Sequence, residues 1–114
     1  MDGKARTLTS VLRELDDGLR KLHGRRYRGL VLYGSQARGE ADEGSDVDLL
    51  LLLDGAVEVG GEIRRSSGLV AALSLEAGRV LSVIPVSAEE YRASSDPYLV
   101  NARREGAPFS RNAV

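Results

Sequence analysis

Two carboxylates, Asp46 and Asp48, are separated by a single residue at the start of the most apolar segment, Val47–Leu53. On a strand, residues i and i+2 project from the same face, so both side chains would lie together. A carboxylate inside a leucine run is costly to desolvate unless its charge is compensated. Such a pair can share one or two Mg²⁺ ions, which supply that compensation. The alternative is structural: Asp46 caps a turn, and Asp48 pairs with an arginine such as Arg38 or Arg28.

Gly34 and Ser35 form a second candidate site directly after the apolar run Gly29–Tyr33. A glycine there allows a sharp turn and a close phosphate, and the following N–H groups and hydroxyl make an anion cradle. A simple turn with a serine N-cap has the same sequence. Together with the aspartates, the pattern describes a phosphate cradle beside paired carboxylates. That combination suits phosphoryl or nucleotidyl transfer, in which catalysis is mostly positioning and charge neutralisation.

The elements that must position these residues follow from apolar periodicity. Leu8–Leu22 has apolar residues three and four apart, which predicts an amphipathic helix. Three strands are predicted over Gly29–Tyr33, Val47–Leu53 (buried on both faces) and Arg79–Val86. Further helices are predicted over Glu62–Leu75, from Ser87, and over Tyr98–Arg104, followed by a loose tail over 109–114. This order predicts an α/β (α+β) fold, a small mixed β-sheet with flanking helices, in a single domain spanning 1–114.

Composition excludes several classes of function. The chain has 114 residues, no cysteine, one histidine (His23) and a formal net charge of −1. These features exclude a disulfide scaffold, a thiolate metal site, a cysteine nucleophile and a His-ligand metal cluster, and they argue against a globally basic nucleic-acid coat. No apolar run approaches the roughly 20 residues of a membrane span, and the first residues lack a signal peptide's apolar segment. A cytoplasmic protein is therefore expected.

The nineteen residues Leu32–Leu50, LYGSQARGEADEGSDVDLL, resemble the signature of the polymerase-β-like nucleotidyltransferase superfamily, and within it the minimal, single-domain MNT type. The resemblance implies a nucleotidyltransferase fold over most of the chain. It also implies a reaction in which an acceptor hydroxyl attacks the α-phosphate of a nucleoside triphosphate and releases pyrophosphate, with Mg²⁺ as the metal. Members of this type commonly accompany a small helical HEPN-type protein, and in toxin–antitoxin pairs they act as antitoxin by transferring AMP from ATP to that partner.

The resemblance assigns roles residue by residue. Gly34 and Ser35 would hold the phosphates of the nucleotide, and Asp46 and Asp48 would be the catalytic ligands of Mg²⁺. Arg38 is placed to meet a phosphate oxygen, and a solvated or ion-paired arginine fits its position equally well.

One position departs from the pattern. The family normally supplies a third carboxylate from the next core strand, and the matching residue here is Ser82 within Gly78–Ile84. A hydroxyl is no general base at neutral pH and brings no charge as a ligand. Glu76 precedes this strand, and Glu89 and Glu90 follow it. The departure favours an alternative function, a catalytically degenerate module that binds a nucleotide or a partner.

The sequence thus predicts a Mg²⁺-dependent nucleotidyltransferase that moves a nucleoside monophosphate to a hydroxyl acceptor, plausibly on a HEPN-type partner protein. An RNA acceptor ranks lower, because four tyrosines and one phenylalanine give little sign of a stacking surface. Exposed apolar strands without a covering domain favour a complex or an oligomer. His23 is interpreted as a cation at a helix end. Tyr91 and Tyr98 are interpreted as core anchors, with contact to a partner as the alternative.

Overall fold

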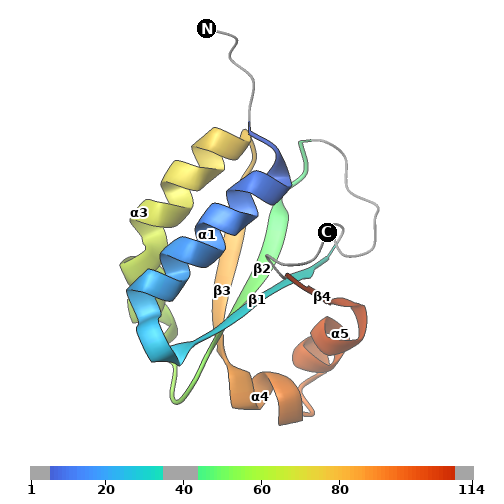
Figure 1. The fold of residues 1–114 in the computed structure, drawn as a ribbon. Coiled ribbons are helices and arrows are strands. Elements are labelled where there is room, and N and C mark those ends of the chain that lie inside the picture. The colour runs from blue at the N-terminus through green and yellow to red at the C-terminus, as the bar shows by residue number, and fades with distance from the viewer. Residues whose placement is uncertain (1–5, 35–43, 110–114) are drawn as a thin grey trace, which may run out of the picture.

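The computed structural model describes residues 6–34 and 44–109, and its central feature is a four-stranded mixed sheet in the order β3-β2-β1-β4 (Figure 1). Strands β2 and β3 are parallel, and β1 is antiparallel to both β2 and β4. The predicted mixed α/β fold is therefore confirmed. In chain order the elements are α1 (Leu8–His23), a 3₁₀ turn (Gly24–Arg26), β1 (Tyr27–Tyr33), β2 (Val47–Leu53), α3 (Val59–Ala77), β3 (Leu81–Ser87), α4 (Ala88–Ala93), α5 (Pro97–Glu105) and β4 (Ala107–Pro108).

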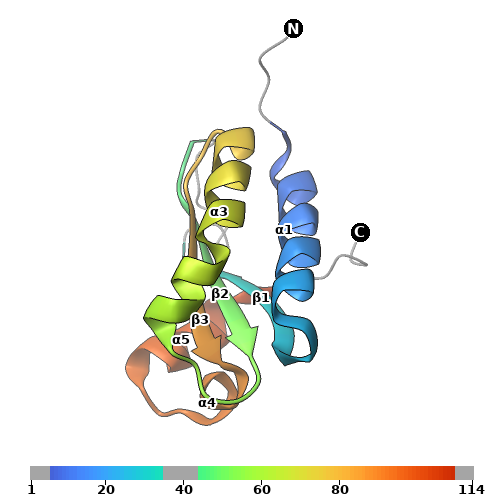
Figure 2. The same ribbon diagram turned by 90° about the vertical axis from the view of Figure 1, so that its left-hand side faces the viewer.

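Helices α1 and α3 lie side by side across one face of the sheet (Figures 1 and 2). The apolar stripe of α1, including Leu15 and Leu19, packs there against every second residue of β2, Leu49, Leu51 and Leu53, to form the main core. The intervening residue Leu50 packs on the opposite face in a smaller second core with Val31 and with Ala102 of α5. The prediction that Val47–Leu53 is a strand buried on both faces is thus confirmed.

Helix ends follow local capping chemistry. Thr7 caps α1, because its side chain accepts a hydrogen bond from the Ser10 N–H, and Gly24 ends that helix at a positive φ of 58°. Helix α3 begins at Val59, earlier than the predicted Glu62. The carboxylate of Glu58 accepts hydrogen bonds from the N–H groups of Gly60 and Gly61, which holds two helix-weakening glycines in the first turn.

Strand β4 was not predicted from the sequence. It has only two residues, Ala107 and Pro108, which pair with Leu32 and Val31 of β1. Phe109, at the start of the expected tail, donates its N–H to the carbonyl of Leu30 at 2.9 Å and packs against the main core. Residues 110–114 lie outside the described part of the chain. In that part, no helix is both long and apolar enough to cross a membrane.

Gly106 allows the end of α5 to approach β1 closely, because it has no side chain. A Cβ at this position would lie 2.3 Å from the carbonyl oxygen of Ala102 and 2.7 Å from a methyl group of Val31. We therefore expect Gly106→Ala to lower the free energy of unfolding by roughly 1–3 kcal/mol through overpacking. Urea unfolding measures this change. Gly68→Ala, at a helical site with open space around it, is the matched control and should raise stability by about 1 kcal/mol. Equal effects of the two substitutions would contradict the packing argument.

Candidate active site

Three side chains on three adjacent strands line up at one end of the sheet. Asp48 of β2 is the register partner of Tyr33 at the end of β1 and of Ser82 near the start of β3. Because alternate residues of a strand share a face, Asp48 lies on the side of Leu50 and the second core, away from α1 and α3. The side chain of Asp48 is half-buried at this end of the sheet. Asp46 precedes the first residue of β2 and is exposed.

Gly34 closes this end of the sheet against Asp48. Its φ is 71°, and a Cβ built on it would lie 2.7 Å from Oδ2 of Asp48. Only a residue without a side chain lets the backbone turn here and leaves room beside the carboxylate. The structure therefore brings Gly34 and Asp48 together. Ser35 and Arg38 lie outside the described residues.

The Gly34 geometry makes a testable prediction. Gly34→Ala would force an alanine into the left-handed region, at a cost of roughly 1–2 kcal/mol, and would push its methyl group into the Asp48 carboxylate. We expect nucleotide affinity, measured by calorimetric titration with ATP and Mg²⁺, to fall by about tenfold or more, because a 1.4 kcal/mol loss is tenfold. Gly44→Ala is the control, since Gly44 has open space around it and no positive φ. An unchanged ATP affinity in Gly34→Ala would remove Gly34 from the binding site.

The structural interpretation of Asp48 as the partner of Arg28 is not supported. Arg28 lies near the other end of β1, and its guanidinium donates to the carboxylate of Asp54 instead. This contact lowers the pKa of Asp54. Arg38, the other arginine considered for that ion pair, is outside the described residues. The half-buried carboxylate of Asp48 therefore keeps its interpretation as a metal ligand.

Ser82 is the register partner of Asp48 on β3, and its match to the third carboxylate of the sequence pattern stays a prediction. Among residues 6–34 and 44–109, no group of three or more acidic, histidine or cysteine side chains gathers that could hold a metal. The donor set here is two carboxylates, with a hydroxyl beside one of them. Mg²⁺ usually keeps several waters and takes one or two carboxylates plus substrate phosphates, so these residues fit it.

Two tyrosines extend this site toward α5. The Tyr98 hydroxyl donates to the Tyr33 hydroxyl at 2.6 Å, and the two rings meet edge to face with centroids 5.9 Å apart. Burial, reinforced by the hydrogen bond to Tyr98 and the charge of Asp48, raises the pKa of Tyr33, so its phenol stays protonated at neutral pH. Tyr98 is 48% exposed, so its interpretation as a core anchor was wrong. Tyr91, in contrast, packs against the second core.

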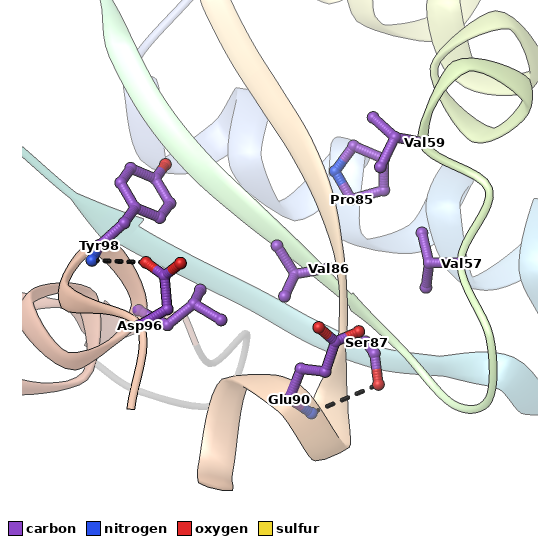
Figure 3. Close-up of a pocket in the computed structure, with 9 residues that line it drawn as sticks. Val57, Val59, Pro85, Val86, Ser87, Glu90, Asp96 and Tyr98 are labelled. Atoms are coloured by element: carbon purple, nitrogen blue, oxygen red, sulfur yellow. Dashed lines mark hydrogen bonds between the residues drawn. The ribbon is translucent and has the colours of Figure 1, made fainter. Parts of the chain in front are cut away.

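Tyr98 separates two cavities on this side of the molecule. The smaller, of about 130 Å³, is lined by Tyr33, Gly34 and residues of α5 including Asn101 and Glu105. The larger, of about 420 Å³, lies between the start of α5, the start of α4 and the end of β3 (Figure 3). The site predicted from the sequence therefore adjoins a hollow surface that no sequence pattern predicted.

His23 belongs to a different environment. Its imidazole is buried where α1 meets α3, with Nδ1 3.6 Å from Oε1 of Glu62. Burial lowers the pKa of His23, and the nearby charges of Arg65 and Arg26 act in the same direction while that of Glu62 opposes them. The neutral form is thus favoured, contrary to the interpretation of His23 as a cation at a helix end. The imidazole lies on the α1/α3 side of the sheet, away from Asp48.

Comparison with known proteins gives consistent results. Residues 12–106 match the model of the nucleotidyltransferase domain family. A toxin–antitoxin crystal structure with AMP-PNP superposes with a TM-score of 0.59 at 14% identity, over 89% of this chain and 71% of that one. A mutant of the toxin–antitoxin MntA–HpeT gives 0.58 at 15% identity, over 86% and 71%. A structure described as a minimal nucleotidyltransferase gives 0.54 at 24% identity, over 96% and 100%. No curated protein is significantly similar in sequence.

Proposed function

The chain belongs to the nucleotidyltransferase domain family, and from this premise we propose that it transfers a nucleoside monophosphate, AMP from ATP, to an acceptor hydroxyl. The observation that carries the proposal is the close approach of Gly34 to the Asp48 carboxylate. A Cβ built on Gly34 would lie 2.7 Å from Oδ2 of Asp48. A glycine turn can receive a phosphate, and a carboxylate beside it can hold the counter-ion of that phosphate, so this contact supports the proposal. The match over residues 12–106 covers both residues.

In the proposed reaction, the acceptor oxygen forms a bond to the α-phosphorus of the nucleotide. The bond from that phosphorus to the bridging oxygen breaks, and pyrophosphate leaves with the electron pair. Gly34 and Ser35 bind the phosphates, and Asp46 and Asp48 are the carboxylates that would hold Mg²⁺ beside them. Ser82 accepts no proton at neutral pH, so the proton of the acceptor hydroxyl passes to solvent.

Asp46 and Asp48 are the residues that would hold Mg²⁺. When bound, the ion neutralises charge on the phosphates and lowers the pKa of the attacking group. Asp48 is half-buried and fixed by pairing on both sides within the sheet, while Asp46 is exposed. The half-buried Asp48 is therefore the more firmly placed of the two carboxylates, and the exposed Asp46 can adjust to the substrate.

We propose a protein as the acceptor. The similar structures include toxin–antitoxin proteins, one of them with AMP-PNP, and the sequence resemblance adds a small helical HEPN-type protein as the expected partner. Among residues 6–34 and 44–109, helices α4 and α5 pack on the side of the sheet that carries Asp48 and leave hollows between them. An acceptor can therefore approach Asp48 from outside the chain.

A second candidate function is contact inhibition by a degenerate module. The observation that favours it is Ser82, which lies beside Asp48 where a third carboxylate would complete the set. Such a module would still bind ATP with Mg²⁺ but would transfer nothing.

Label transfer distinguishes the two functions. The purified protein is incubated with α-phosphate-labelled ATP, Mg²⁺ and protein and RNA fractions of its source cells, beside the double variant Asp46→Asn/Asp48→Asn. We expect label on one protein, absent with the double variant. Label on RNA would correct the acceptor class. Intact ATP binding with no label on any fraction would instead support the degenerate module.

A further inference from the structure

The larger cavity beside Tyr98 combines an apolar lining with acidic groups. Val86, Leu99 and the ring of Tyr98 are among its apolar lining residues, and Val86 and Tyr98 are labelled in Figure 3. The carboxylates of Glu90 and Asp96 line the same cavity, and no lysine or arginine is among the described residues that line it. Its polar groups are therefore chiefly hydrogen-bond acceptors. An occupant that suits it is flat and apolar, with N–H donors at its edge.

The cavity adjoins the candidate active site at Tyr98. This residue lines both the larger cavity and the smaller one that contains Gly34, and its hydroxyl holds Tyr33, the register partner of Asp48. Val86 is on the same face of β3 as Ser82 and lies four residues further along. At about 3.3 Å per residue, that separation is about 13 Å. An extended nucleotide with its α-phosphate at Asp48 can reach the cavity with its base.

We propose that this cavity is the base subsite of the nucleotide, and that it selects a base with an exocyclic amino group. The inference rests on the proposed function and adds the residues that recognise the base of its nucleotide. The base packs on Val86 and Leu99 with its face or edge against the Tyr98 ring. Its amino group donates to the Glu90 carboxylate.

The capping hydrogen bonds explain why Glu90, and not Asp96, accepts the hydrogen bond from the amino group of the base. One carboxylate oxygen of Asp96 already accepts the Tyr98 N–H at 2.9 Å, as the N-cap of α5. At Glu90 the main-chain N–H is the capped group, donating to the Ser87 hydroxyl, while the side chain lies in the cavity (Figure 3). A base that presents a carbonyl oxygen instead of an amino group would face a carboxylate with no proton between them, which is unfavourable.

A matched pair of nucleotides tests this selection without requiring turnover. ATP and purine riboside 5′-triphosphate differ only by the 6-amino group, and calorimetric titration with Mg²⁺ gives the affinity of each. We expect the wild-type protein to bind ATP about tenfold more tightly, the value of one hydrogen bond to a charged acceptor. In Glu90→Ala the ratio should fall to about one. Glu89→Ala is the control, because Glu89 is in the same helix turn and does not line the cavity.

The Tyr98 ring gives an independent measurement. Tyr98→Leu should weaken both nucleotides by the same factor, about fivefold or more, because a stacking surface is lost whatever the base carries. Tyr98→Phe, which keeps the ring, should lose much less. A change in the ATP preference with Tyr98→Leu of the same size as with Glu90→Ala would contradict this division of roles.

The outcomes separate this inference from the proposed function. If the wild-type protein binds both nucleotides equally, or if Glu90→Ala and Glu89→Ala behave alike, the base subsite is wrong and the proposed function stands. If the wild-type protein binds neither nucleotide, the proposed function fails, and the subsite fails with it.

Discussion

Replacing Asp48 by asparagine should reduce the rate of nucleotidyl transfer by about 10³-fold or more. The substitution removes the negative charge of one of the two predicted metal ligands, next to the reacting phosphate. Asparagine has nearly the same shape, so the packing against Gly34 and the strand pairing stay in place. The rate of label transfer from α-phosphate-labelled ATP measures the effect, and the thermal midpoint shows that the fold is retained.

Asp54→Asn is the matched control for that substitution. Asp54 follows β2 directly, at the opposite end of the strand from Asp48, and its carboxylate pairs with Arg28 at the surface. Exposed ion pairs contribute little to stability, so this variant should transfer label at close to the wild-type rate. If Asp48→Asn keeps more than about a tenth of the wild-type rate, Asp48 is not a ligand on which catalysis depends.

Ser82→Asp should restore the third carboxylate and raise the transfer rate by about 10²-fold, the lower end of what a positioned general base contributes. The register partner of Ser82 is Asp48, so the new carboxylate would project from the same face, directly beside it. The same proximity has a cost. Two adjacent like charges destabilise the sheet, so the variant should unfold at a lower temperature than the wild type without Mg²⁺, and Mg²⁺ should reverse most of that loss.

Ser82→Asn separates charge from size in this experiment. It has the shape of the aspartate without its charge, so it should neither gain activity nor respond to Mg²⁺ in its unfolding temperature. If the unfolding temperature of Ser82→Asp does not change with Mg²⁺, the ion is not held at this end of β2 and β3. A variant stabilised by Mg²⁺ but no faster than the wild type would show that proton removal does not limit the reaction.

The parts of the fold that the sequence predicted well are those in which one strong local signal determines the element. Val47–Leu53 has the predicted bounds because turn residues flank an apolar run that is buried on both faces. The elements that the sequence predicted poorly depend on contacts with distant residues or on a cap that offsets a weak local signal. Two glycines concealed the start of α3 at Val59, because the Glu58 cap that offsets them was not anticipated. Strand β4 has too few residues for any periodicity, and it exists because β1 has a free edge.

The same division applies to the site. The sequence predicted that Ser82 lies on the core strand next to that of Asp48, and the parallel register pairs the two residues. The match of Ser82 to the missing carboxylate stays a prediction. The pairing of Tyr33 with Tyr98 spans 65 residues, and neither residue carries a local signal for the other. Asp46 was expected to share a strand face with Asp48, yet it precedes β2, because the ladder begins at Val47. The roles of Ser35 and Arg38 stay predictions.

The unequal division of the apolar core determines which part of this protein can open alone. Separating α1 or α3 from the sheet would expose most of the buried leucines, whereas lifting α5 exposes little beyond the small cluster around Ala102. Since exposure costs free energy in proportion to apolar area, partly opened states of the native protein release the carboxyl-terminal helix first. Tyr98 leaves with that helix, while Gly34 and Asp48 remain on the folded body. The protein thus has a firmly packed part, formed by α1, α3 and the sheet, and one helix, α5, that can detach while the rest stays folded.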